Sequence, residues 1–226
     1  MAMDRLSLGR FLELIQLSQN RRLKVIERDA RKAVFEERFG KPTDARDFYG
    51  PFWSDAKRSV VDEDFSLRDA TQERITSSKS RRRLYPHLLA GFDAGWTTLK
   101  ESRIGDATLQ LVSKLAVTIK GSEEEDHIRA SNVLAVTDPS GRLHITYPYF
   151  SKDVGLGVRH ARLGIGVLKE GFSIAKPATI AMLDVLRGRM FFDDGAGVSD
   201  LHRKQLVERY DAVMREWRAQ KRIHRR

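Results

Sequence analysis

The stretch that decides the fold class covers residues 133–150 and reads VLAVTDPSGRLHITYPYF. Two runs rich in β-branched and aromatic residues, 133–137 and 142–150, flank the four residues Asp138-Pro139-Ser140-Gly141. Aspartate at the first position of a turn, proline at the second and glycine at the fourth are the residues that a type I turn favours. The stretch therefore predicts an antiparallel β-hairpin. Pro148, late in the second run, indicates a sheet edge or the end of a strand, because proline cannot donate a ladder hydrogen bond.

The chain on either side of this hairpin supplies further strand patterns. After Gly105 the apolar residues alternate with polar ones, at Leu109, Leu111, Leu115, Val117 and Ile119. This period of two predicts a half-buried strand, or two strands separated by a bulge near Val112. After the hairpin, residues 161–168 predict one more strand.

Helical patterns occupy both ends of the chain. Apolar residues at spacings of three and four predict helices over residues 6–17, 20–40, 51–60 and 85–99. Ser66, with Asp69 three residues later, predicts the start of a further, mostly polar helix over residues 66–75. Gly91 and Gly95 inside the helix over residues 85–99 favour close approach by another element. Two more helices are predicted at the C-terminal end, over residues 177–192 and from Ser199 onward.

These elements predict an α+β fold: an N-terminal helical half, an antiparallel β-sheet with a hairpin in the middle, and two C-terminal helices. We place the helical half at residues 1–103. The sheet, the C-terminal helices and a basic tail occupy residues 104–226. The two parts form either separate domains or one integrated domain.

Composition excludes several classes of protein. The 226 residues contain no cysteine, which excludes disulfide scaffolds, cysteine zinc fingers and thiol nucleophiles. Aromatic residues make up 8% of the chain, enough bulky material to argue against a wholly disordered protein. No apolar run approaches the roughly 18 residues of a membrane span, and Asp4 interrupts any signal-peptide pattern. We expect a cytoplasmic protein with no membrane partner.

Charge points to a partner class. The chain has 41 Lys and Arg against 31 Asp and Glu, a formal net charge of +10. The excess lies at the two ends, and basic clusters of this kind attract phosphate backbones without reading sequence. The candidate nucleic-acid-binding residues are Lys79, Arg81, Arg82, Arg83, Arg218, Lys221, Arg222, Arg225 and Arg226.

Motifs for catalysis, cofactors and metals are not found. The six histidines include no pair at metal-ligand spacing, and no phosphate-binding P-loop is present. The acidic clusters Asp62–Asp64, Glu123–Asp126 and Asp193–Asp194 fall in predicted links, where neighbouring carboxylates diverge. We therefore predict no catalytic residue, no metal site and no cofactor.

Four stretches together resemble an uncharacterised family of bacterial proteins. They are Asp47-Phe48-Tyr49-Gly50-Pro51, Tyr85 to Trp96, the hairpin up to Tyr147-Pro148-Tyr149-Phe150, and the segment from Pro177. The resemblance implies a bacterial origin and one recurring unit formed by the helical and sheet parts. It implies no activity.

Three functions are consistent with these observations. The first is a non-enzymatic bacterial accessory protein that binds DNA, RNA or a ribonucleoprotein through its basic clusters. The second is a protein–protein interaction or regulatory module, which uses the apolar face of the first helix and the aromatic segment around Trp53. The third is a metal-dependent nuclease or phosphate-handling hydrolase whose residues meet only in the fold.

Overall fold

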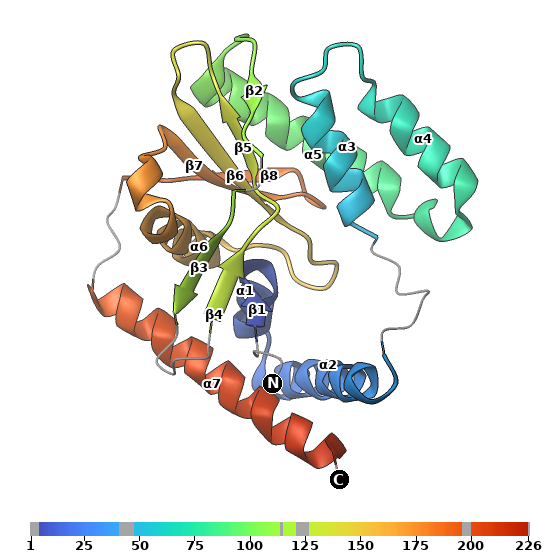
Figure 1. Ribbon diagram of the computed structural model, residues 1–226, viewed down its shortest axis with the longest axis vertical. Coiled ribbons are helices and arrows are strands. Elements are labelled where there is room, and N and C mark those ends of the chain that lie inside the picture. Colours follow the sequence, from blue (N-terminus) through green and yellow to red (C-terminus); the bar gives the residue numbers. More distant parts are fainter. Residues whose placement is uncertain (1–4, 41–47, 114, 121–126, 196–199, 226) are drawn as a thin grey trace. The chain divides into compact units, whose positions relative to one another are not determined.

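The computed structural model describes residues 5–40, 48–113, 115–120, 127–195 and 200–225, and its chain divides into two compact units (Figure 1). Unit 1 combines Met1–Arg46, Thr118–Arg129 and Gly197–Arg226. Unit 2 combines Asp47–Val117 and Ala130–Ala196. The boundary expected from the sequence, between residues 103 and 104, falls inside the first segment of unit 2.

In the part of unit 1 that the structure describes there are three helices and a small sheet. The helices are α1 (Leu8–Gln16), α2 (Gln19–Phe39) and α7 (Asp200–Arg225). The strands are β1 (Arg5–Ser7), β3 (Val117–Lys120) and β4 (His127–Ala130), in the order β1-β4-β3, with β1 parallel to β4. The Ser7 side chain caps α1, and Phe11 of α1 packs edge-on against Tyr210 of α7 with ring centroids 5.7 Å apart.

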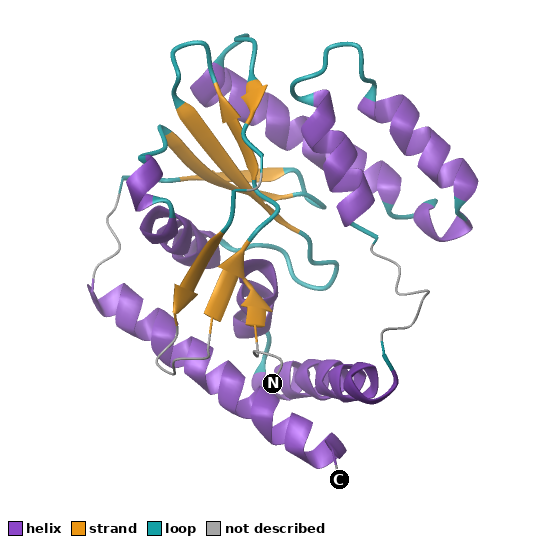
Figure 2. Cartoon of the chain, viewed as in Figure 1, coloured by secondary structure: helices purple, strands orange, loops and turns teal. Residues whose placement is uncertain are grey.

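Unit 2 is a five-stranded sheet with helices (Figure 2). Its α-helices are α3 (Gly50–Ser59), α4 (Leu67–Ser77), α5 (Tyr85–Leu99) and α6 (Val158–Gly171). Shorter helical turns are η1 (Lys79–Arg81), η2 (Lys100–Ile104) and η3 (Ser173–Ala175). The strands are β2 (Gln110–Leu111), β5 (Leu134–Thr137), β6 (Leu143–Tyr149), β7 (Thr179–Asp184) and β8 (Arg189–Phe192), in the order β2-β5-β6-β7-β8.

The predicted hairpin is confirmed, and so is the α+β class. Strands β5 and β6 pair antiparallel around the turn at Asp138, but β6 and β7 are parallel, so the sheet is mixed rather than antiparallel. Strand β6 is central rather than an edge, but Pro148 does lie at the end of the strand, as the other alternative predicted. Pro148 is tolerated there because it is the last residue but one of β6 and lies beyond the pairing with β5, which ends at Leu134 opposite Thr146.

Two segment predictions are wrong. Residues 161–168 lie in helix α6 instead of a strand, and residues 177–192 form the antiparallel pair β7–β8 instead of a helix. Every residue of β7 is buried, and residues 180–183 form a continuous apolar run without alternation, as strands covered on both faces do. Such a run also fits a buried helix. Two helices do lie in the C-terminal part of the chain, but they are α6 and α7.

A hydrophobic core of unit 2 lies between helices α3, α4 and α5 and one face of the sheet. Phe52 and Trp53 of α3 and Phe92 of α5 pack edge-on around this core. The expected close approach at the glycines of α5 is confirmed: a Cβ on Gly91 would lie 1.8 Å from the Val185 carbonyl oxygen. Figure 1 shows α5 and α6 on opposite sides of β7, so this strand is covered on both faces.

The described helices contain no segment that is both long and apolar enough to cross a membrane.

Candidate nucleic-acid interface

Helix α2 separates an apolar face from a basic one. Its buried residues are Ile26, Ala30 and Val34. At 100° per residue, the opposite side of the helix carries a row of exposed side chains at spacings of three and four. We call four of them, Arg21, Lys24, Arg28 and Arg31, the α2 basic row.

The charges of the α2 basic row are only weakly compensated. Arg28 Nε lies 3.4 Å from Asp29 Oδ1, and Arg31 Nη2 lies 3.5 Å from Glu27 Oε1. Both arginine side chains are about 70% exposed. Exposed pairs of this kind contribute about 0–1 kcal/mol and are screened by salt. Arg21 and Lys24 form no ion pair with any other residue that the structure describes. The row therefore presents positive charge to solvent.

The inner sides of α2 and α7 are joined by ion pairs. Arg22 donates two hydrogen bonds to Glu216, at 2.7 and 2.8 Å. Lys221 and Arg225 each lie 2.7 Å from a carboxylate oxygen of Glu37. The hydrogen bond from Lys221, followed by that from Arg225, lowers the pKa of Glu37 below its ordinary value. The last turns of α7 are thus part of the packed helix pair.

This packing divides the C-terminal candidate residues into two groups. Lys221 is buried, at 7% exposure, and Arg225 is exposed but paired with Glu37. Arg218 is half-buried, whereas Arg222 is exposed. Arg226 lies outside the described residues. The charge of this terminus is therefore partly neutralised within unit 1.

The second predicted cluster lies in unit 2, at the turn that joins α4 to α5. Lys79, Arg82 and Arg83 are exposed there. Arg81 is half-buried, and its guanidinium lies 5.5 Å from the centre of the Tyr85 ring, within cation–π range. The structure does not bring this cluster and the C-terminal cluster together in one unit.

Other sequence candidates prove to be structural. Trp53 and its neighbour Phe52, in the aromatic segment expected to contact a protein partner, are at most 2% exposed. The apolar face of α1 is also buried, with Leu8 and Phe11 at 0% exposure. These side chains are therefore unavailable for the protein-partner contact expected from the sequence.

The acidic clusters remain dispersed. Asp193 and Asp194 each pair with a cation of α6, Lys169 at 2.7 Å and Arg162 at 2.9 Å. Asp62 pairs with Arg58 at 2.8 Å, and Glu123–Asp126 lies outside the described residues. Within the described ranges, no three His, Asp or Glu side chains converge to hold a metal ion.

Comparison of the sequence with protein-family models and with curated proteins finds no match. The resemblance to an uncharacterised bacterial family therefore stays a prediction.

Sequence reasoning missed the α2 basic row, although its signal was present. The predicted helix over residues 20–40 was characterised by its apolar positions and by the pair of Glu27 with Arg31, not by its row of basic residues. The same helical spacing, applied to its polar side, places Arg21, Lys24, Arg28 and Arg31 in one line. Sequence reasoning looked for basic residues that are close together in the chain. The four residues of the α2 basic row are instead spread over eleven positions.

Proposed function

We propose that this protein binds the phosphate backbone of nucleic acid through the outer faces of α2 and α7 in unit 1. The observation that carries the proposal is the α2 basic row: four cationic side chains in line, all exposed, on the face opposite the helix core. As part of the same proposal, the protein is a bacterial, cytoplasmic accessory factor without enzymatic activity toward the nucleic acid.

The charge balance of the two helices supports this assignment. Residues 19–39 and 200–225 together contain fifteen Lys and Arg against eight Asp and Glu, an excess of seven positive charges. The whole chain has an excess of ten. The helix pair thus carries most of the net positive charge of the chain. A partner with regularly spaced negative charges, such as a phosphate backbone, would complement this charge.

The dimensions of the row fit a nucleic-acid backbone. From Arg21 to Arg31 the helix rises about 15 Å, at about 1.5 Å per residue. One strand of duplex DNA carries a phosphate about every 3.4 Å along the axis, so about four phosphates face the row. Nothing in this arrangement reads base edges, so we expect binding that tolerates changes of sequence.

Fluorescence anisotropy with labelled oligonucleotides tests the proposal. The test variant replaces Arg21, Lys24, Arg28 and Arg31 with glutamine. A matched control removes the same charge from exposed positions of unit 2, through Lys152→Gln, Arg159→Gln, Lys176→Gln and Arg189→Gln. We expect about a ten- to thousandfold loss of affinity at 0.1 M salt in the test variant and a much smaller loss in the control.

Three separate probes, duplex DNA, single-stranded DNA and duplex RNA, identify the class of nucleic acid. Equal affinities of the two variants for all three probes would contradict the proposal, because a general effect of net charge would then explain the binding. Variants of Lys79, Arg82 and Arg83 test in the same assay whether the cluster of unit 2 contributes.

A further inference from the structure

A buried chain of three polar side chains runs across the sheet of unit 2. His144 Nδ1 lies 3.0 Å from Thr179 Oγ1, and His144 Nε2 lies 3.4 Å from Asp138 Oδ2. The exposed fractions of these residues are 6% for Asp138, 2% for His144 and 7% for Thr179. Each member of the chain therefore depends on its protein neighbours for hydrogen bonds.

The hairpin turn and the sheet register fix this chain. Asp138 begins the β5–β6 turn, and its Oδ1 accepts hydrogen bonds from the backbone N–H groups of Ser140 and Arg142, at 2.9 and 3.0 Å. Its Oδ2 accepts from Arg142 Nε at 2.7 Å. His144 and Thr179 are register partners on the parallel strands β6 and β7. His144 and Thr179 thus stand side by side on two adjacent strands, and Asp138 contacts His144 from the turn.

Burial works to raise the pKa of Asp138, but the hydrogen bonds from Arg142 and His144 outweigh it and lower that pKa to about 2. Asp138 is therefore a carboxylate near neutral pH and can only accept hydrogen bonds. His144 donates its Nε2–H to this carboxylate, so in the neutral imidazole Nδ1 is an acceptor. The Thr179 hydroxyl then donates its proton to His144, which leaves its oxygen lone pairs open to other contacts.

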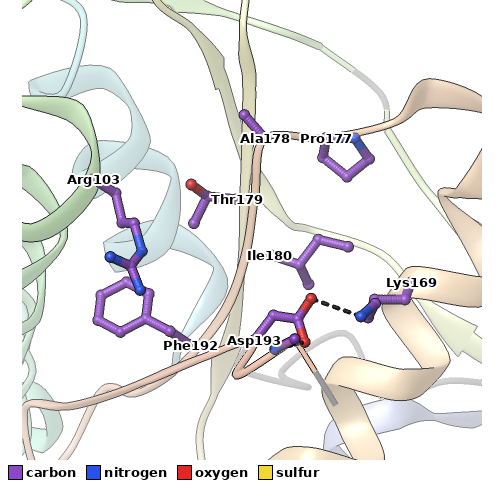
Figure 3. A pocket seen from close by; sticks show the side chains of 9 residues that line it. Arg103, Lys169, Pro177, Ala178, Thr179, Ile180, Phe192 and Asp193 are labelled. Atoms are coloured by element: carbon purple, nitrogen blue, oxygen red, sulfur yellow. Dashed lines mark hydrogen bonds and ion pairs between the residues drawn. The ribbon is translucent and has the colours of Figure 1, made fainter. Parts of the chain in front are cut away.

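Thr179 also lines a pocket of about 260 Å³ (Figure 3). On one side of Thr179 the pocket is lined by Arg103, whose guanidinium stacks 4.8 Å from the centre of the Phe192 ring. On the other side lies Lys169, paired with Asp193 at 2.7 Å. Two cations against one carboxylate leave the lining positive, which favours an anionic group in the ligand.

We propose that this pocket is a hydrolytic site for a small carboxylic ester that carries an anionic group, with Thr179 as the nucleophile. In this arrangement a hydroxyl is hydrogen-bonded to an imidazole, and a carboxylate holds the imidazole in position. Such an arrangement activates a hydroxyl as a nucleophile. The 3.4 Å contact of His144 with Asp138 is longer than an ideal hydrogen bond, as such contacts often are before a substrate binds. Asp138 acts as a positioning residue.

In the first step, Thr179 Oγ1 forms a bond to the carbonyl carbon of the ester while its proton passes to His144 Nδ1. The bond from that carbon to the leaving alcohol breaks, and the alcohol takes the proton from His144. Water then attacks the acyl-threonine, and His144 accepts a proton from the water. Return of this proton to Thr179 releases the carboxylic acid. Arg103 and Lys169 provide the positive charge that stabilises the anionic oxygen formed on attack.

This activity goes beyond the proposed nucleic-acid binding and does not rest on it, since all of its residues belong to unit 2. The probe that tests it is the mono-p-nitrophenyl ester of succinic acid, with p-nitrophenyl acetate as the uncharged comparison. We expect release of p-nitrophenolate and a succinyl adduct that peptide mass spectrometry maps to Thr179 in the full-length wild-type protein.

Thr179→Val keeps the shape of the side chain without the hydroxyl, so it should lower the rate at least a hundredfold, while Thr179→Ser retains both turnover and adduct. Arg103→Gln should slow hydrolysis of the succinate ester more than that of the acetate. A wild-type protein that forms no adduct at Thr179, or a folded Thr179→Val variant with an unchanged rate, would overturn the nucleophile assignment. Equal slowing of both esters by Arg103→Gln would overturn the preference for an anion. If Thr179→Val fails to fold, adduct mapping on the wild-type protein decides.

Discussion

At the scale of single residues, Asp138 has a role both in the fold, as part of the hairpin turn, and in the proposed hydrolytic site of unit 2. Its side chain accepts from the turn backbone, from the Arg142 guanidinium and, at a longer distance, from His144. The sequence predicted its role in the turn, because Asp-Pro-x-Gly has known turn chemistry. Its contact with His144, and through it with Thr179, depends on the parallel register of β6 and β7, which local sequence does not encode.

The lowered pKa of Asp138 predicts a pH dependence of stability. Because the folded state keeps the pKa near 2 instead of 3.8, folding favours the ionised form, and this contribution is complete above about pH 4. It is lost as the pH falls from about 4 to 2. We therefore expect Asp138→Asn to be less stable than the wild type at pH 7, with the difference closing toward pH 2. Urea unfolding at a series of pH values measures this, and a difference that stays constant down to pH 2 would contradict it.

At the scale of elements, the errors and successes of sequence reasoning have physical causes. Helix α5 was predicted with its exact bounds, since one face carries a broad stripe of large apolar residues. Helix α6 was taken for a strand because Gly164, Ile165 and Gly166 are poor helix formers in isolation. Its buried positions Ala161, Ile165 and Leu168 nevertheless follow helical spacing. Packing of α6 against β7 therefore stabilises the helix despite the low helix propensity of these residues.

The contact of α2 with α7 gives a prediction at this scale. Glu37→Gln removes the counter-charge of buried Lys221 and should lower the free energy of unfolding by about 1–2 kcal/mol. The matched control is Glu27→Gln, whose exposed partner Arg31 lies 3.5 Å away, and its effect should stay within about 0.5 kcal/mol. Chemical unfolding of the full chain measures both, and equal effects would show that the inner ion pairs carry no special weight.

The same contact rules out a simple truncation as a test of binding. Deleting residues 218–226 would remove the partners of Glu37 together with the terminal charge. A loss of affinity after truncation would then report lost packing as much as lost phosphate contacts.

At the scale of the whole molecule, the basic residues behind the net charge of +10 are distributed unevenly between the two units and between the faces of the helices. Composition alone predicted a polyanionic partner, and clustering along the chain drew attention to residues 79–83 and the C-terminus. The packing of the helices in unit 1 changes which basic residues are available to such a partner. Glu37 neutralises part of the terminal charge through Lys221 and Arg225, whereas the α2 basic row faces solvent. The chain order could not show this, because α2 and α7 lie at opposite ends of the sequence.

The salt dependence of binding shows how many phosphates the α2 basic row contacts. For duplex DNA, the logarithm of the association constant falls with the logarithm of salt concentration by about 0.9 for each phosphate contact. Replacing Arg21, Lys24, Arg28 and Arg31 with glutamine should therefore reduce the slope by about 3–4. The unit 2 control variant, with the same change of net charge, should keep the wild-type slope to within about 1. A slope that the α2 substitutions leave unchanged would contradict the account.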